Sequence, residues 1–199
     1  MPTLIVCAVD AEAEAVRAGL ADPGRFSVMT SGVGPAAAAA STATALARGE
    51  YDAVVNAGVC GAFQGRADIG DTLIAVRTAA ADLGVDLADQ FQPLDELGFG
   101  SMTVDCDPSL TEGVEGYRGD ILTLTSITGT ADKGLLLTNR FPAALGEAME
   151  GFGVATAARQ AGLPFAEVRT VSNFVGDRDV AGWDWKGAFG ALTEAVSRL

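Results

Sequence analysis

The sequence predicts an α/β fold in which a sheet is layered between helices. Short apolar segments rich in β-branched residues alternate with alanine-rich segments, and glycine-rich turns join the two kinds. The chain has 199 residues, of which 49% are apolar, and no repeat or low-complexity linker interrupts it. That length suffices for one full hydrophobic core, so we expect residues 1–199 to form a single domain.

In the first half of the chain, buried strands are expected wherever continuous apolar runs occur. The expected strands are Thr3–Val9, Phe26–Thr30, Tyr51–Val55 and Thr72–Thr78. A helix capped by Asp10 should run to about Leu20, and a second should begin at Pro35, because proline at the first helical position loses no hydrogen bond. Glycine-rich loops are expected at Ser31–Pro35 and Asn56–Phe63, and loops of this kind at one sheet edge form a pocket.

The second half is less regular at its start. The span from Leu87 to about Gly119 lacks clear periodicity, which is typical of a lid, a binding loop or a subunit contact, with a short strand near Ser101–Asp105. Further strands are expected at Asp120–Thr128 and Phe165–Ser172. Helical segments are expected at Ala131–Asn139 (helix or loop), at Met149–Ala161, and at the C-terminus, where Trp183, Phe189, Leu192 and Val196 should be mostly core.

Charge and composition exclude several classes of partner. Thirteen basic and 26 acidic residues give a net charge of −13, which repels nucleic acid and anionic membranes. No apolar span of 18 residues and no signal-peptide pattern occurs, so we expect neither export nor membrane insertion. Cys7, Cys60 and Cys106 form no C-x-x-C pair, which favours a reducing cytoplasmic compartment.

The sequence contains no histidine. Ser-His-Asp and Cys-His nucleophilic machinery is therefore excluded, and so is the commonest metal ligand. Any acid–base chemistry must come from carboxylates, amides or water, and we expect neither a metal nor an organic cofactor.

The stretch from Ala148 to Asp179 is the strongest indication of a binding site. Glu150 begins an apolar helix, and the strand that follows ends at Ser172 and Asn173. Ligands of open α/β sheets bind at the carboxyl ends of strands, so these polar groups should face a substrate. The segment Gly32–Ala37 also fits the dinucleotide pattern G-x-G-x-x-A, but it follows the second strand and no acidic residue ends the next one. A turn close to a small ligand is the simpler interpretation.

Five segments in this order resemble the nucleoside phosphorylase and nucleosidase superfamily. They are Ala8-Val-Asp-Ala-Glu12, Ser31-Gly-Val-Gly34, Asn56-Ala-Gly-Val-Cys-Gly61 followed by Gly70-Asp71, Met149-Glu-Gly151 and Val171-Ser-Asn173. The resemblance implies a three-layer α/β/α phosphorylase/hydrolase-like fold with a central mixed sheet. Within the superfamily, Leu94-Asp-Glu-Leu-Gly98 and Val168–Asp179 look most like the futalosine hydrolase family, which cleaves futalosine to hypoxanthine and dehypoxanthine futalosine in an alternative menaquinone pathway.

The resemblance implies roles for individual residues. Glu150 would accept hydrogen bonds from the ribose hydroxyls, and Glu12 would orient and deprotonate the attacking water, with Glu14 as a reserve candidate. The alternative for both glutamates is a favourable charge near a helix N-terminus. The substrate-binding set comprises Gly58, Val59, Met149, Glu150, Ser172, Asn173 and Arg178.

Asn173 bears on the choice of base. Adenine-specific relatives carry an aspartic acid at this position, whereas an amide NH₂ can donate to N7 and O6 of a 6-oxopurine. Asn173 therefore favours hypoxanthine, unless it only caps the strand end. Arg178 would meet the benzoate of futalosine, while the alternative role of Arg169 is a structural ion pair within its strand. The base-stacking residue stays open among Phe91, Phe99, Phe152 and Phe174.

Several alternatives remain at this point. Asp10, Glu12 and Glu14 in the first loop would repel phosphate, so hydrolysis is favoured over phosphorolysis. The substrate could instead be aminodeoxyfutalosine or methylthioadenosine/S-adenosylhomocysteine. Less favoured hypotheses for the protein class are a purine nucleoside phosphorylase, a non-catalytic nucleoside-binding module and a dinucleotide-binding protein. The resemblance also implies a homo-oligomer, a dimer or larger.

Overall fold

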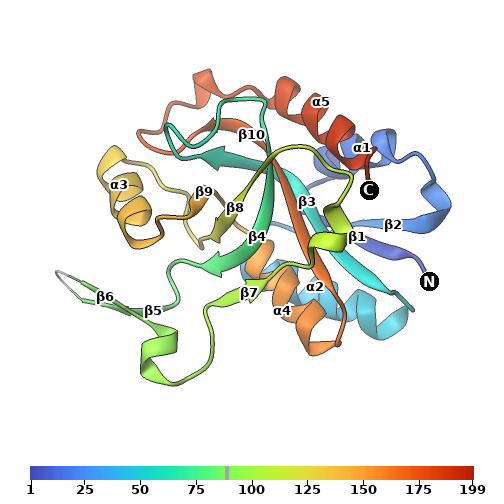
Figure 1. Cartoon of the computed structure of the whole chain (residues 1–199), viewed down its shortest axis with the longest axis horizontal. Helices are drawn as coiled ribbons and strands as arrows, with labels where there is room; N and C mark the ends of the chain where they lie inside the picture. Colours follow the sequence, from blue (N-terminus) through green and yellow to red (C-terminus); the bar gives the residue numbers. More distant parts are fainter. Residues whose placement is uncertain (88–89) are drawn as a thin grey trace.

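The computed structural model describes residues 1–87 and 90–199 and has an α/β architecture (Figure 1). The helices are α1 (Asp10–Gly19), α2 (Pro35–Arg48), α3 (Ala131–Arg140), α4 (Gly151–Gln160) and α5 (Trp185–Val196). The strands are β1 (Thr3–Cys7), β2 (Phe26–Thr30), β3 (Ala53–Ala62), β4 (Thr72–Ala80), β5 (Gly84–Asp86), β6 (Phe91–Pro93), β7 (Thr103–Asp105), β8 (Tyr117–Thr123), β9 (Ala144–Ala148) and β10 (Phe165–Phe174).

Helices cover both faces of the main sheet. Alternate residues of β1 point to opposite sides, as the strand period requires. Ile5 and Cys7 pack with α1 and α5, whereas Leu4 and Val6 pack with α2 and α4. The two helix pairs lie above and below the sheet in Figure 1. The predicted three-layer arrangement is confirmed.

Among the described residues, the main sheet has eight strands of mixed direction, including β7, which pairs antiparallel with β4. β2, β1, β3 and β10 are parallel neighbours, and β4 runs antiparallel to β10. β8 continues parallel to β4, and β9 parallel to β8. β9 then pairs antiparallel with the far end of β3 through Gly61 and Ala62, so the strands β3, β10, β4, β8 and β9 form a closed ring. The predicted central mixed sheet is confirmed.

The structure corrects several predicted boundaries. β3 runs through Asn56–Phe63 as far as Ala62, although its glycines predicted a loop there. β8 ends at Thr123 and not at Thr128, and β10 extends past Ser172 to Phe174. The first strand ends at Cys7 and not at Val9. The N-cap of α1 is Val9 and not the predicted Asp10, which is the first residue of the helix.

Other differences concern the middle of the chain. β9 was not predicted at all, and α4 begins at Gly151 two residues later than expected. The irregular span after Leu87 contains β6, β7, short 3-10 turns and the first residues of β8. Residues 88 and 89 lie outside the described part of the chain. Within the described part, no helix is long and apolar enough to cross a membrane.

Candidate active site

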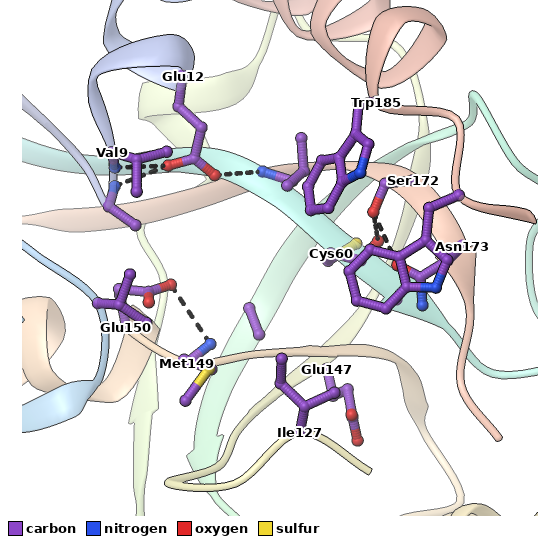
Figure 2. Close-up of a pocket in the computed structure, with 16 residues that line it drawn as sticks. Val9, Glu12, Cys60, Ile127, Glu147, Met149, Glu150, Ser172, Asn173 and Trp185 are labelled. Carbon is purple, nitrogen blue, oxygen red and sulfur yellow. Dashed lines mark hydrogen bonds between the residues drawn. The ribbon is translucent and has the colours of Figure 1, made fainter. Parts of the chain in front are cut away.

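A pocket opens at the carboxyl ends of β1, β3 and β10 (Figure 2). Its walls come from the start of α1, the turn before α2, the ends of β3, β9 and β10, and the segment that leads into α5. Six of the predicted site residues line it: Glu12, Val59, Met149, Glu150, Ser172 and Asn173. Figure 2 shows Glu12 and Glu150 along one side, with Ser172, Asn173 and Trp185 across from them.

Glu12 is buried in the first turn of α1, with 3% of its surface exposed. The backbone N–H of Ala8 donates to its Oε2 (2.7 Å), and that of Val59 donates to its Oε1 (2.9 Å). Burial raises the pKa of Glu12 above its usual value, while Arg169 and these two N–H groups act in the opposite direction. A carboxylate fixed in this way, with a raised pKa, suits a general base. Glu14, the reserve candidate, is exposed and does not line the pocket.

Glu150 is the N-cap residue of α4 and is also buried. Its Oε1 accepts from the backbone N–H of Gly34 at 3.1 Å, and its Oε2 accepts from the N–H of Met149 at 3.3 Å. Gly34 belongs to the turn that matched the dinucleotide pattern, and its φ of 95° is one that glycine adopts readily. This turn therefore serves to hold Glu150.

Arg169 places a buried positive charge close to both carboxylates. It is fully buried, and its Nε donates to Glu167 Oε1 at 2.9 Å, while its Nη1 lies 3.4 Å from Glu150 Oε2. Its Nη2 donates to the side-chain oxygen of Asn56. Burial alone would lower the pKa of Arg169, but Glu167, Glu150 and Glu12 together raise it, so the guanidinium stays charged. The structural pairing expected of Arg169 is present, although its position between Glu12 and Glu150 was not foreseen.

Gly58 does not line the pocket but lies directly behind Glu12. A Cβ at this position would collide with the Glu12 carboxylate and would lie 2.9 Å from Nη1 of Arg169. The glycine in β3 thus permits the close approach of these two charged groups.

Asn173 and Ser172 lie at an irregularity of β10. The β10–β3 register shifts between Val171 and Asn173, and both Ser172 and Asn173 line the pocket instead of alternating across the sheet. Ser172 Oγ lies 2.8 Å from Asn173 Oδ1, and Asn173 Nδ2 donates to the carbonyl of Phe174 at 3.0 Å. Asn173 is only partly buried, so its amide is accessible to a ligand.

The aromatic wall of the pocket consists of tryptophans. Trp183 and Trp185 line it, with ring centroids 5.0 Å apart, whereas none of the four phenylalanines considered from the sequence does. Trp183 was expected to belong to the core of the last helix, but it precedes α5. Arg178 is exposed and does not line the pocket; its guanidinium carbon lies 5.3 Å from the centroid of the Trp183 ring.

Glu147 is a lining residue that sequence reasoning missed. It lies in β9, is 6% exposed, and accepts hydrogen bonds from Thr128 N–H (2.8 Å) and Thr128 Oγ1 (2.6 Å). Burial raises the pKa of Glu147, while the Thr128 bonds and Lys133 oppose the rise. The sequence offered no signal for it, because β9 itself was not predicted.

Cys60 also lines the pocket. Burial raises the pKa of its thiol to about 12, so the group stays protonated and acts as a small apolar residue. Within residues 1–87 and 90–199, no group of three or more His, Cys, Asp or Glu residues could hold a metal ion.

Comparison with known proteins identifies the family. The model of the phosphorylase superfamily matches residues 5–198. The chain belongs to this superfamily. A futalosine hydrolase of Streptomyces coelicolor is 41% identical over an alignment of 223 residues that covers 100% of this chain and 95% of the relative. One from Acidothermus cellulolyticus is also 41% identical, covering 98% of this chain and 89% of the relative. Within the superfamily, the chain therefore belongs to the futalosine hydrolase family.

Solved structures of a futalosine hydrolase and of a nucleosidase share the fold. The native futalosine hydrolase of Helicobacter pylori strain 26695 superposes with a TM-score of 0.83 at 18% identity, covering 99% of this chain and 95% of that one. A 5'-methylthioadenosine/S-adenosylhomocysteine nucleosidase from Neisseria meningitidis, in complex with methylthio-immucillin-A, gives 0.82 at 20% identity, covering 99% and 96%. At these identities the likeness concerns the fold alone.

Proposed function

We propose that this protein hydrolyses the N-ribosidic bond of futalosine and releases hypoxanthine and dehypoxanthine futalosine. The observation that carries the proposal is the pair of buried carboxylates, Glu12 and Glu150, in one pocket with the amide of Asn173 on the other side. The full-length identity of 41% to a futalosine hydrolase supports the same substrate.

The two carboxylates suit the charge that develops during the reaction. Cleavage of the N-ribosidic bond builds positive charge on the ribose and negative charge on the departing purine. Glu150 would accept hydrogen bonds from the ribose hydroxyls and stabilise the cation. Glu12 would orient a water molecule and take its proton, a general-base role typically worth about 10²–10⁴-fold in rate.

Asn173 would bind the leaving base. Its Nδ2 donates to the carbonyl of Phe174, a local bond that a ligand can replace. The amide could then donate to N7 or O6 of hypoxanthine, where a carboxylate would be repelled. Met149, Val59 and Ser172 complete the substrate contacts, and Gly58 contributes by admitting Glu12 to its position.

Water is the proposed nucleophile. Glu12 faces the pocket, and Asp10 and Glu14 are exposed close by on α1, so this side of the site carries negative charge. Phosphate would be repelled there.

Arg178 is proposed as the partner of the substrate benzoate. Its guanidinium carbon lies 5.3 Å from the centroid of the Trp183 ring, and Trp183 lines the pocket, so Arg178 lies near the pocket edge and suits a carboxylate there. Trp183 and Trp185 are proposed to contact the aromatic parts of the substrate.

The wider setting follows from the proposed substrate. We place the reaction in the futalosine route to menaquinone and in the cytoplasm, with residues 1–199 acting as one nucleosidase-like domain without cofactor. Homo-oligomerisation is also proposed. Val33 and Ile127, apolar residues at the pocket, are 56% and 46% exposed and would suit a partner subunit.

Base release tests the proposal directly. Purified protein is incubated with futalosine, aminodeoxyfutalosine, methylthioadenosine and inosine, with and without phosphate, and the released base is identified by chromatography. Hypoxanthine from futalosine, independent of phosphate, is expected. Adenine release would instead make the protein a nucleosidase of 6-aminopurine substrates, and dependence on phosphate would make it a phosphorylase.

A further inference from the structure

Three neighbouring strands place Asn173, Gly61 and Glu147 in one row across the sheet. Gly61 of β3 pairs with Asn173 of β10 on one side and with Glu147 of β9 on the other. Directly paired residues project from the same face of a sheet. The row exists because β9 closes the ring of strands onto the end of β3.

Gly61 leaves space between the two side chains. Adjacent strands lie about 4.8 Å apart, so the Cα atoms of Asn173 and Glu147 should be roughly 10 Å apart. Glu147, Gly61 and Asn173 all line the pocket. A side chain at Gly61 would be crowded, because its Cβ would lie 3.1 Å from Asn173 Nδ2. The glycine therefore keeps open the floor between an amide and a carboxylate.

Thr128 holds the Glu147 carboxylate in one orientation. Each Glu147 oxygen accepts one hydrogen bond from Thr128, through its N–H and its hydroxyl. A carboxylate offers about four lone-pair sites, so both oxygens can accept a further donor. In Figure 2, Glu147 lies beside Ile127, below Asn173, on the side of the pocket away from Glu12.

The edge of a 6-oxopurine presents N7, O6 and N1–H in order, which are two acceptors followed by a donor. We propose that Glu147 accepts the hydrogen bond of N1–H while Asn173 donates to N7 or O6. Glu147 is then a second determinant of base specificity, and this inference rests on the proposed function. Adenine has an unprotonated N1, whose lone pair would face the carboxylate, and its 6-amino group cannot accept from Asn173 as O6 can, so adenine should be disfavoured.

Glu147→Gln is the informative substitution. A glutamine can accept from N1–H through its carbonyl or donate to the N1 of adenine through its NH₂, so the penalty against adenine should disappear. We expect the ratio of hypoxanthine affinity to adenine affinity, measured by calorimetry with the free bases, to fall at least about tenfold. The ratio of kcat/KM for futalosine over aminodeoxyfutalosine should fall in parallel.

Thr128→Val is the matched control. It removes one of the two bonds to Glu147 but leaves the carboxylate and the backbone bond, so the base preference should be retained. An unchanged ratio in Glu147→Gln would overturn the inference. So would an equal change in both variants, because Glu147 would then act only by holding the Thr128 segment.

The wild-type protein separates this inference from the proposed function. Its release of hypoxanthine from futalosine tests the function, whereas the affinities of free bases need no turnover. If the wild type fails to cleave futalosine but prefers hypoxanthine, and Glu147→Gln abolishes that preference, the specificity role stands without the proposed substrate.

Discussion

The two ends of the pocket are built differently. At the end where the ribose is proposed to bind, which we call the ribose end, Glu12 and Glu150 are buried, and every carboxylate oxygen accepts from a backbone N–H. At the other end, Asn173 is only partly buried and Trp185 is 42% exposed. Buried charges require fixed hydrogen-bond or ionic partners, whereas neutral amides and aromatic rings can remain partly exposed to water. Both carboxylates proposed to act at the ribose are therefore fixed by the core, whereas at the other end Glu147 is fixed in this way while Asn173 and Trp185 stay partly exposed.

The largest effect is expected from Glu12→Gln. The amide keeps the size of the side chain but cannot take a proton from water, so kcat should fall by about 10²–10⁴-fold. Substrate binding, measured by calorimetry, should stay nearly intact. Steady-state kinetics with futalosine checks the change, and Glu14→Gln on the exposed side of α1 is the control.

The pH dependence sharpens the same prediction. A general base must be ionised, and burial raises the pKa of Glu12 above 4.5. In the wild type, kcat/KM should therefore fall as pH drops through this raised pKa, and Glu12→Gln should lose that acid limb. Unchanged turnover in the variant would remove Glu12 from the mechanism.

Arg169→Met should give the largest loss of stability. It would leave Glu167 and Glu150 as buried carboxylates without their cation, a change that typically costs about 3–5 kcal/mol. Urea unfolding measures the loss. The exposed Arg159 on α4 supplies a matched control, since Arg159→Met should stay within about 0.5 kcal/mol. A loss below about 1 kcal/mol for Arg169→Met would contradict the view that the ribose end depends on the core.

Asn173→Asp tests the base end. A carboxyl group can protonate the N7 of adenine but repels O6 when ionised, so the preference for futalosine over aminodeoxyfutalosine should fall by roughly tenfold, or about 1.4 kcal/mol. Ratios of kcat/KM from competing substrates provide the measurement. Asn139→Asp, exposed on α3, adds the same charge away from the pocket and should leave the ratio unaltered.

The smallest effect is expected from Arg178→Ala. An exposed ion pair contributes about 0–1 kcal/mol, so KM for futalosine should rise by no more than about fivefold. KM for inosine, which lacks the benzoate, should not change, nor should either value in Arg159→Ala. An equal rise for both nucleosides would mean that Arg178 supports Trp183 and not the carboxylate.

The sequence correctly predicted the helices and strands that short stretches of residues specify by themselves. Thr3–Cys7 and Phe26–Thr30 are apolar runs, and the proline at the start of α2 marks its N-terminus. The sequence motifs also selected Glu12, Glu150 and Asn173, which the structure places in one pocket.

The prediction errors concern segments whose structure depends on contacts with residues distant in the sequence. Gly58 and Gly61 predicted a loop at the end of β3, but both belong to the extended strand. Gly58 leaves room for the side chain of Glu12, and Gly61 leaves room for that of Asn173. β9 contains Gly146 and Glu147 and forms because β3 and β8 accept it on both sides. A residue whose neighbours come from distant strands, such as Glu147, cannot be placed before that pairing is known.

The irregular register of β10 has a consequence for how this pocket could change. Because the strand carries one extra residue near Ser172, two consecutive side chains face the ligand. Deleting Ser172 would restore one-to-one pairing and leave Asn173 opposite Gly61, so the pocket would lose one of its two side chains from this strand. The shape of the pocket therefore depends on the length of β10 as well as on the identity of its residues, and an insertion or deletion in this strand would change it.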